Sequence, residues 1–367
     1  MALHKYQDTL QKTKWIFIFI VSLYSFLLSI NLLGCGLQLL GKGFAERLIS
    51  FTANPIVALF IGILTTSIVQ SSSATTSIVV GMVACQTLNL ENAIFIIMGA
   101  NIGTTITNTL VSLTHITRKI EFQRAFPAAI VHDFFNILSV AVLFPLELRF
   151  HILRHSSAIL ADIFKSIGGI SFVSPLKYII NPLSFGIETL FKHNGVVIVI
   201  FAIILLFVAL KFLVDAMKVL ITKRLELIID RYIFGSPIQS FLIGLIVTAI
   251  IQSSSVTTSL MVPLVGAGLL TIYKIYPYTL GANIGTTVTA ILASLITQSQ
   301  LAIQIAFSHL LFNIIGSCIW YPARAVPINL AIWFGRFASQ KRLIVILYIL
   351  VAFYLIPVIF IILNRML

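Results

Sequence analysis

The sequence predicts an all-α polytopic membrane protein made of two inverted-topology repeats. Three observations indicate this fold: long apolar runs, a pair of polar motifs that occurs twice, and a difference in charge between equivalent loops. Of the 367 residues, 59% are hydrophobic and only 10% are charged. Soluble domains carry about 25% charged residues, so the composition already indicates a membrane protein.

Several apolar runs are long enough to cross a bilayer, whose hydrocarbon core of about 30 Å needs roughly 20 helical residues. The clearest are Trp15–Leu33, Val196–Val214 and Leu343–Leu363. Only helices or closed barrels satisfy their own backbone groups inside lipid, and long apolar runs favour helices. The first run is too long for a removable signal peptide and lacks a cleavage signature, so we expect a retained helix.

The formal net charge of +13 is explained by loops rather than by a surface for nucleic acid. Lys and Arg gather in short loops between apolar runs, as at 118–124, 223–231 and 336–342. Cytoplasmic loops have this composition under the positive-inside rule, so we expect no nucleic-acid partner. The three cysteines lie far apart in the sequence and predict neither a disulfide framework nor a metal site.

Two polar motifs each occur twice, which indicates an internal repeat. IVQSSSATTS at Ile68–Ser77 recurs as IIQSSSVTTS at Ile250–Ser259, and GANIGTT at Gly99–Thr105 recurs unchanged at Gly281–Thr287. Both pairs keep one offset of 182 residues (68 to 250, 99 to 281). One unit of the fold is therefore used twice.

The repeat divides the chain into five predicted parts. These are a cytoplasmic N-terminus at 1–14, transmembrane repeat 1 at 15–148, an extramembrane linker at 149–196, transmembrane repeat 2 at 197–322, and a C-terminal segment at 323–367 with one further transmembrane helix.

The equivalent loops after the two GANIGTT segments differ in charge. Thr117–Arg124 carries three basic residues, whereas Thr297–Gln300 carries none. Since short basic loops stay on the cytoplasmic side, we expect these loops on opposite faces. Similar sequence in opposite orientation is an inverted repeat, an architecture of secondary transporters whose substrate site lies near the midplane between the halves.

Each QSSS run divides an apolar stretch, Pro55–Cys85 or Pro237–Leu264, into two arms too short for a full crossing. We interpret each as a re-entrant or broken helical hairpin with QSSS at its tip, and GANIGTT as a break in the next helix. Hydroxyls and small residues also pack membrane helices. Four adjacent polar residues, twice, are costly to desolvate, and this favours a binding site over packing alone.

The chemistry of the tips indicates an anion next to a hard cation. Half-helix N-termini favour anions, and serine hydroxyls both donate and accept, so they suit hydrogen phosphate. The glutamine, asparagine and threonine oxygens are neutral hard ligands that suit sodium. The candidate sodium ligands are Gln70, Thr75, Asn101 and Thr104, with Gln252, Thr257, Thr258, Asn283 and Thr286 in the second repeat.

At these motifs the chain resembles the type II sodium-dependent phosphate cotransporters. The resemblance covers both repeats and runs over NPIVALFIGILTTSIVQSSSATTSIVV, IMGANIGTTITNTLVSL and YPYTLGANIGTTVTAILASL. It implies sodium-coupled phosphate uptake by alternating access, and phosphate held by both tips. The implied phosphate residues are Gln70, Ser71, Ser72, Ser73, Gln252, Ser253, Ser254 and Ser255.

This interpretation has further consequences for partners and location. We expect inorganic phosphate, Na⁺ as coupling ion and the lipid bilayer as partners, with no other cofactor and no enzymatic activity. We expect a multi-pass protein of a bacterial inner membrane with a cytoplasmic N-terminus, and no soluble regulatory domain after residue 363. The sequence leaves the oligomeric state open, a homodimer included. Rival functions are phosphate export, transport of another oxyanion, and a passive anion channel.

His132 and His309 begin matching HxxFN motifs, and two interpretations stand. One is a proton-sensitive group near the site; the other is a hydrogen bond that braces neighbouring helices. Asp133 has no counterpart, because Leu310 occupies the matching position. An acid in a membrane segment is a functional candidate, unless it lies at the interface.

The loop charges predict that Ile120 is cytoplasmic and Ser299 is periplasmic. Single cysteines at these two positions, in a background without Cys35, Cys85 and Cys318, would be treated on intact cells with a membrane-impermeant maleimide. We expect labelling at position 299 and protection at 120 until the cells are lysed. Equal labelling of both positions would rule out the inverted repeat.

Overall fold

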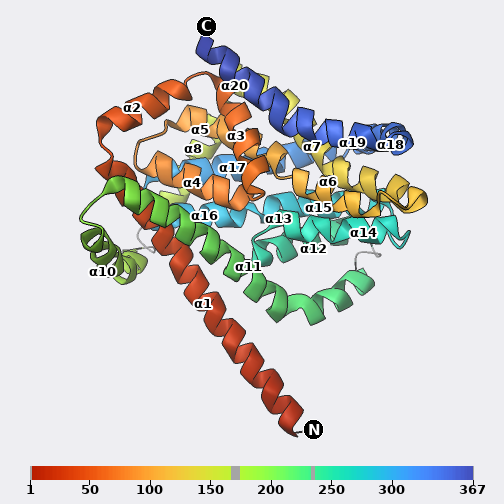
Figure 1. The fold of residues 1–367 in the computed structure, drawn as a ribbon, viewed down its shortest axis with the longest axis horizontal. Coiled ribbons are helices and arrows are strands. Elements are labelled where there is room, and N and C mark those ends of the chain that lie inside the picture. The colour runs from red at the N-terminus through yellow and green to blue at the C-terminus, as the bar shows by residue number, and fades with distance from the viewer. Residues whose placement is uncertain (1, 167–173, 233–235, 367) are drawn as a thin grey trace.

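The computed structural model describes residues 2–166, 174–232 and 236–366, and within these ranges it consists of helices and short loops without a β-strand. Figure 1 shows the helices stacked into one body, from which α1 extends to the N-terminus. Repeat 1 contains α1 (Ala2–Leu39), α2 (Lys42–Phe51), α3 (Pro55–Val69), α4 (Ser72–Ala84), α5 (Leu90–Gly103), α6 (Ile106–Ser112), a 3₁₀ turn (Leu113–His115) and α7 (Lys119–Phe150).

The second half repeats this order of helices. It contains α11 (Gly195–Tyr232), α12 (Pro237–Ile251), α13 (Ser254–Ser259), α14 (Met261–Gly266), α15 (Ile272–Gly285), α16 (Thr287–Thr297) and α17 (Gln300–Trp320). The predicted linker forms α8 (Ile152–Ser166) and α10 (Ser174–Leu190), which pack on α17 and α1. That the linker lies outside the membrane stays a prediction.

Seven helical segments in the described residues are long and apolar enough to cross a membrane, which confirms the polytopic all-α fold. They are Thr13–Leu39, Leu90–His115, Lys119–Phe150, Gly195–Ala216, Ile272–Thr297, Gln300–Trp320 and Leu343–Leu363. Each repeat thus supplies three spans, and the seventh stands outside the repeats as predicted.

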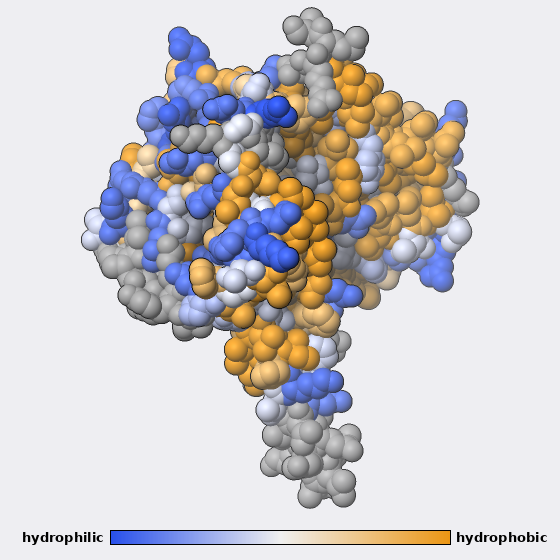
Figure 2. Space-filling model, turned by 60° about the vertical axis from the view of Figure 1, so that its left-hand side comes forward, coloured by the Kyte–Doolittle hydropathy of each residue, from blue (hydrophilic) through white to orange (hydrophobic). Residues whose placement is uncertain are grey.

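The outward faces of these spans are apolar, as a lipid-facing surface must be. Along α11, Val197, Ile200, Ile204 and Phe212 are all at least 40% exposed. Figure 2 shows such side chains merging into broad hydrophobic areas of the surface. These exposed apolar side chains are therefore expected to face lipid rather than water.

The C-terminal part holds one element that the sequence analysis did not predict. Helix α18 (Ala325–Gln340) packs along α7. Because Gly335 has no side chain, α18 lies directly against the ring of Pro127 on α7. The predicted last span follows as α19 (Arg342–Leu350), a π-helical turn (Val351–Leu355) and α20 (Ile356–Met366). It packs on α3, with Phe60 and Phe360 stacked 4.5 Å apart.

Both QSSS runs end one short helix and begin another, as predicted. Gln70 (φ 55°) and Gln252 (φ 59°) adopt the left-handed backbone conformation that terminates α3 and α12. Helix α4 begins at Ser72 and α13 begins at Ser254. The arms α3 and α12 have 15 residues each, about 22 Å of helix, which is too short to cross the membrane alone.

The glycines of GANIGTT pack helices, and the helix break lies just beyond them. A methyl group on Gly99 would collide with the Leu59 carbonyl of α3, and one on Gly281 would collide with the Phe241 carbonyl of α12. These glycines therefore let α5 approach α3, and α15 approach α12, at backbone contact. Helix α5 ends only at Gly103, and α6 restarts at Ile106.

Helices α1 and α11, the first of each repeat, pack side by side and antiparallel (Figure 1). The backbone of Gly36 faces Ile198 and Val199, whereas Gly195 faces Gly36 and Leu39. Residue numbers thus rise along one helix as they fall along the other. An inverted repeat requires equivalent spanning helices to run in opposite directions, as α1 and α11 do; the inverted topology of the whole repeats stays a prediction.

We predict that Gly99→Ala and Gly281→Ala each destabilise the protein, because overpacking at a backbone contact costs about 1–3 kcal/mol. The measurement is the melting temperature of detergent-solubilised protein, followed by size-exclusion chromatography after heating. Gly43→Ala in α2 is the control, since no atom lies within 4 Å of its added methyl group. Equal melting of all three variants would contradict the close packing of α3 with α5 and of α12 with α15.

Candidate functional site

The first serine of each tip caps a helix. Ser71 Oγ accepts from the backbone N–H of Ala74 at 3.2 Å, and Ser253 Oγ accepts from Val256 N–H at 3.4 Å. An N-cap serine satisfies one of the N–H groups that a helix start leaves open. The second and third serines then lie in the first turn, where the helix dipole favours an anion.

The two tips meet each other across the repeats. Ser73 Oγ donates to the carbonyl oxygen of Gln252 at 2.8 Å, although 179 residues separate them. Thr104 Oγ1 donates to Ser72 Oγ at 3.0 Å and lies 3.3 Å from Ser255 Oγ. The structure therefore brings both QSSS runs, together with the end of the first GANIGTT motif, into one polar cluster.

A cavity of about 270 Å³ opens beside this cluster. Gln70, Ser71 and Ser73 line it from one repeat, and Gln252 and Ser253 line it from the other. The remaining wall is α11, which contributes apolar side chains together with Lys211 and Asp215. Both tips thus share one cavity.

Lys211 brings a cationic side chain to this cavity, although it lies within the predicted apolar run Val196–Val214. Its place in the lining follows from how α11 crosses the two tips. The signal in the sequence was a lysine inside a membrane-length helix, which is a functional candidate by default.

The predicted threonine ligands lie one turn behind the tips. Thr66 Oγ1 donates to Thr75 Oγ1 at 3.0 Å, and the equivalent pair Thr248 and Thr257 lie 2.7 Å apart. Thr258 Oγ1 contacts Asn108 Oδ1 across the repeats at 3.0 Å. The first two pairs connect the two arms of each hairpin, and Thr258 connects the second hairpin to α6 of repeat 1.

Of the two predicted asparagine ligands, Asn283 belongs to a buried side-chain network between the repeats, whereas the amide of Asn101 donates to the Ile97 carbonyl of its own helix at 2.9 Å. Asn283 Nδ2 donates to Asn136 Oδ1 and to Asn313 Oδ1, at 2.9 and 2.8 Å. Its Oδ1 lies 3.1 Å from His132 Nε2. Asn136 in turn donates to the backbone oxygen of Asn101 at 2.7 Å. All these side chains are at most 1% exposed.

This network agrees with the bracing interpretation of His132, which connects α7 to α15. His309 differs, because neither of its ring nitrogens has a partner among the described residues. The matching HxxFN motifs therefore have different surroundings.

The two tips also differ in which of their side-chain oxygens have hydrogen-bond partners. In repeat 1, Ser72 and Thr104 are hydrogen-bonded to each other. Their counterparts in repeat 2, Ser254 Oγ and Thr286 Oγ1, have no partner among the described residues, and neither has Gln252 Oε1. Unpartnered buried oxygens are costly, and two predicted sodium ligands, Gln252 and Thr286, together with the predicted phosphate residue Ser254, therefore have lone pairs available. No group of three or more His, Cys, Asp or Glu suited to a metal occurs in the described part.

The sequence of this chain matches a known protein family. The model of the Na⁺/Pi-cotransporter family matches residues 25–171 and 205–335. The chain belongs to this family. The two matched segments contain both tips and both GANIGTT motifs, which are the elements that form the polar cluster.

Several mammalian proteins are similar to this chain over most of its length. Sodium-dependent phosphate transport protein 2B of Pongo abelii is 33% identical over 91% of the chain and 63% of its own length. Protein 2A of Rattus norvegicus is 33% identical over 91% and 65%, and human protein 2B is 32% identical over 91% and 63%. The chain thus spans a little under two thirds of these relatives. No solved structure matches it.

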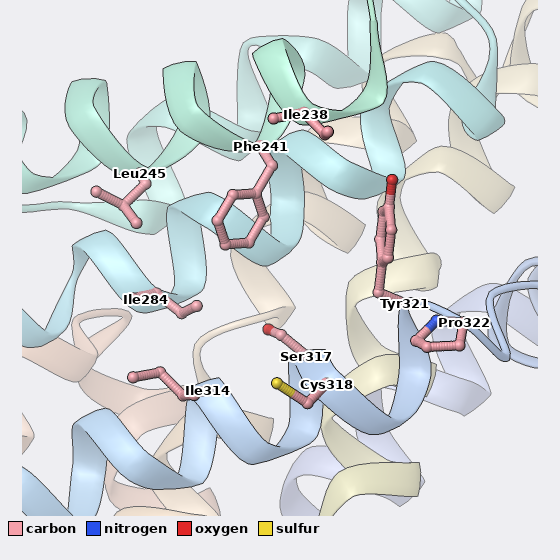
Figure 3. Close-up of a pocket in the computed structure, with 9 residues that line it drawn as sticks. All are labelled: Ile238, Phe241, Leu245, Ile284, Ile314, Ser317, Cys318, Tyr321 and Pro322. Carbon is pink, nitrogen blue, oxygen red and sulfur yellow. The ribbon is translucent and has the colours of Figure 1, made fainter.

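A larger cavity of this cotransporter-family chain is separate from the tips. About 590 Å³ in volume, it lies between α12, α15 and α17. Figure 3 shows its lining, in which Phe241, Leu245, Ile284 and Ile314 present carbon to the space. With no charged side chain in its wall, it suits a lipid chain rather than an ion.

We predict that alanine substitutions of two candidate sodium ligands change different properties, the melting temperature for Asn283 and the sodium dependence of uptake for Gln252. Asn283→Ala removes three contacts and strands buried partners, at about 1–3 kcal/mol each, so it should lower the melting temperature by several degrees. Gln252→Ala removes an oxygen without a partner, so it should melt like the parent and instead raise the sodium concentration for half-maximal uptake severalfold. Similar melting of both variants would contradict the division into scaffold and ligand.

Proposed function

We propose that this chain is a secondary active transporter that couples sodium to the uptake of inorganic phosphate. The meeting of the two QSSS tips across the repeats carries this proposal, through the contacts Ser73–Gln252 and Ser72–Thr104–Ser255. The names of the relatives, sodium-dependent phosphate transport proteins, support it. Membership of the cotransporter family supports a transporter rather than an enzyme.

Phosphate would be held by hydroxyls and helix starts rather than by a metal. Ser72, Ser73, Ser254 and Ser255 lie in the first turns of the helices that begin at the tips, where N–H groups and the dipole favour an anion. Serine hydroxyls can also accept the proton of hydrogen phosphate, which sulfate lacks. Lys211 adds positive charge at the wall of the shared cavity.

Sodium would be held by neutral oxygens beside the anion. Gln252 Oε1, Ser254 Oγ and Thr286 Oγ1 have free lone pairs, and hard cations take such oxygen ligands. A cation next to the anion offsets the charge that phosphate brings into the membrane. This reciprocal stabilisation is a physical basis for coupling, since each ion binds better when the other is present.

The inverted topology proposed for the repeats is supported by contacts at the ends of α7. That helix has 32 residues, about 48 Å, and it begins at Lys119, within the basic segment 117–124. Beyond its other end, α8 carries Arg154 and Lys165, which bond Gln304 and Gln300 at the start of α17. The uncharged loop 297–300 therefore lies far from the basic loop, as alternating access between two faces needs.

The decisive experiment is phosphate uptake into proteoliposomes under an inward sodium gradient, with potassium as the control ion. A symporter accumulates phosphate above equilibrium only with sodium. A passive channel gives flux without accumulation, and an exporter or a carrier of another oxyanion fails to accumulate phosphate in this direction.

We predict that Ser72→Ala and Ser254→Ala each lower sodium-driven uptake at least tenfold. One hydrogen bond to a charged group is worth about 1.5–3 kcal/mol, or roughly 10- to 150-fold in binding. Initial rates would be measured per inserted transporter, with Ser22→Ala on α1 as a control outside both motifs. If both tip variants keep the parental uptake kinetics, the tips only pack helices and phosphate binds elsewhere.

A further inference from the structure

A cavity of about 870 Å³ lies where helices α7 and α15 begin. Helix α18 forms its third side, and Figure 1 shows this helix beside α7. The cavity is separate from the tips, since no residue of either QSSS run lines it. Its described wall contains three cations, Lys119, Arg124 and Arg336, and no acidic residue.

These three cations have no acidic partner. The ion pairs in the part of the chain that the structure describes join other residues. The acid nearest in the sequence is Glu121, which is held by His115 at 2.9 Å and by Arg118 at 3.1 Å. The guanidinium of Arg124 lies against Gly268, where an added methyl group would collide with it. Like charges in one cavity repel each other, and a bound anion would remove that repulsion.

Two helix starts also open on the cavity. Helix α7 begins at Lys119 and α15 begins at Ile272, and both residues line the cavity. Neither start has a hydrogen bond from a capping side chain, so the N–H groups of both first turns lack a side-chain acceptor. The positive ends of two helix dipoles therefore add to the charge of the three cations.

The equivalent place in the other half satisfies its own charges and helix starts. There α8 packs on α17, as α18 packs on α7. Arg154 of α8 pairs with Glu91 at 3.5 Å, whereas Tyr273 occupies the position of Glu91 in the basic cavity. Asn89 caps α5 and Ser299 caps α17. One framework thus neutralises itself at one place and leaves positive charge open at the other.

The surroundings of the cavity indicate that its ligand is amphiphilic. Trp333 and Phe337 on α18 are 66% and 52% exposed, with their rings stacked 6.5 Å apart. Exposed tryptophan is typical of the membrane–water interface, and membrane-length segments begin at the cavity with both α7 and α15. Apolar side chains, among them Val265 and Ile332, share the wall with the cations. A matching ligand has an anionic head and an apolar part.

We propose that this basic cavity binds the phosphate head group of an anionic phospholipid. Arg and Lys form charge-assisted hydrogen bonds with phosphate oxygens, and basic pockets between membrane helices on the cytoplasmic side bind anionic head groups. The segment 117–124, which supplies two of the cations, is the one predicted to be cytoplasmic. The lipid would connect α18 to both repeats, through α7 and α15. This binding needs no transport, so it does not rest on the proposed function.

The test is native mass spectrometry of the delipidated protein, titrated with phosphatidylglycerol or with phosphatidylcholine of the same acyl chains. One variant combines Arg124→Gln with Arg336→Gln, and the other, Tyr273→Glu, places an acid where Glu91 stands in the other half. We expect the parent to bind phosphatidylglycerol at least tenfold more tightly than phosphatidylcholine. The double variant should lose this preference, and Tyr273→Glu should weaken phosphatidylglycerol binding severalfold.

The matched control is Arg154→Gln, which removes an arginine whose charge Glu91 already balances. It should bind phosphatidylglycerol like the parent. Size-exclusion chromatography and the melting temperature check folding. If the double variant does not fold, Tyr273→Glu decides, because Tyr273 is 57% exposed and tolerates replacement; parental phosphatidylglycerol binding in this variant then overturns the proposal.

Two further results would overturn the proposal: equal binding of both lipids by the parent, or parental phosphatidylglycerol binding by a folded double variant. Binding of ³²P-labelled inorganic phosphate separates a lipid from a free anion. If the double variant loses phosphate binding but keeps phosphatidylglycerol binding, the cavity takes the free anion and not the lipid. Loss of phosphatidylglycerol binding with parental phosphate binding supports the lipid. None of these results depends on sodium or on uptake.

Discussion

A helix that ends inside a membrane leaves backbone N–H and C=O groups where no lipid can bond them, and the rest of this structure depends on how that problem is solved. It arises twice, at Gln70 and at Gln252. Ser71 and Ser253 satisfy part of each helix start from within the repeat. The freed carbonyl of Gln252 is satisfied by Ser73 from the other repeat. Repeat 1 therefore completes the tip of repeat 2.

The glycines make this meeting geometrically possible. With no side chain at Gly99 and Gly281, the arms α3 and α12 lie in backbone contact with α5 and α15. Thr104, five residues after Gly99, then reaches both Ser72 and Ser255. Close helix packing and contact with the tips are thus two successive roles of one motif. Van der Waals contact between such surfaces is the main force that associates helices in lipid.

Identical motifs do not have identical surroundings here. Ser72 and Thr104 are bonded, whereas Ser254 and Thr286 are not, and His132 is braced by Asn283 whereas His309 is unpartnered. The C-terminal span packs on α3 of repeat 1. The two repeats are therefore unequal in their contacts, although their motifs are the same.

The sequence by itself determined the membrane class, the two repeats, the break at QSSS and the residue types of the site. These are local properties: apolar length, self-similarity, and polar residues whose desolvation needs a reason. It could not find α18, the packing role of the GANIGTT glycines, or the place of Lys211 beside the tips.

Only the tertiary structure decided which oxygens meet. Asn283, predicted as an ion ligand, has its amide used by Asn136, Asn313 and His132, whereas Gln252 Oε1 remains unpartnered. Asp133 could have been an interfacial acid until Tyr348, 215 residues away, was found bonded to it. A hydrogen bond is made within about 3 Å in space, and no spacing along a chain specifies that distance between segments that far apart.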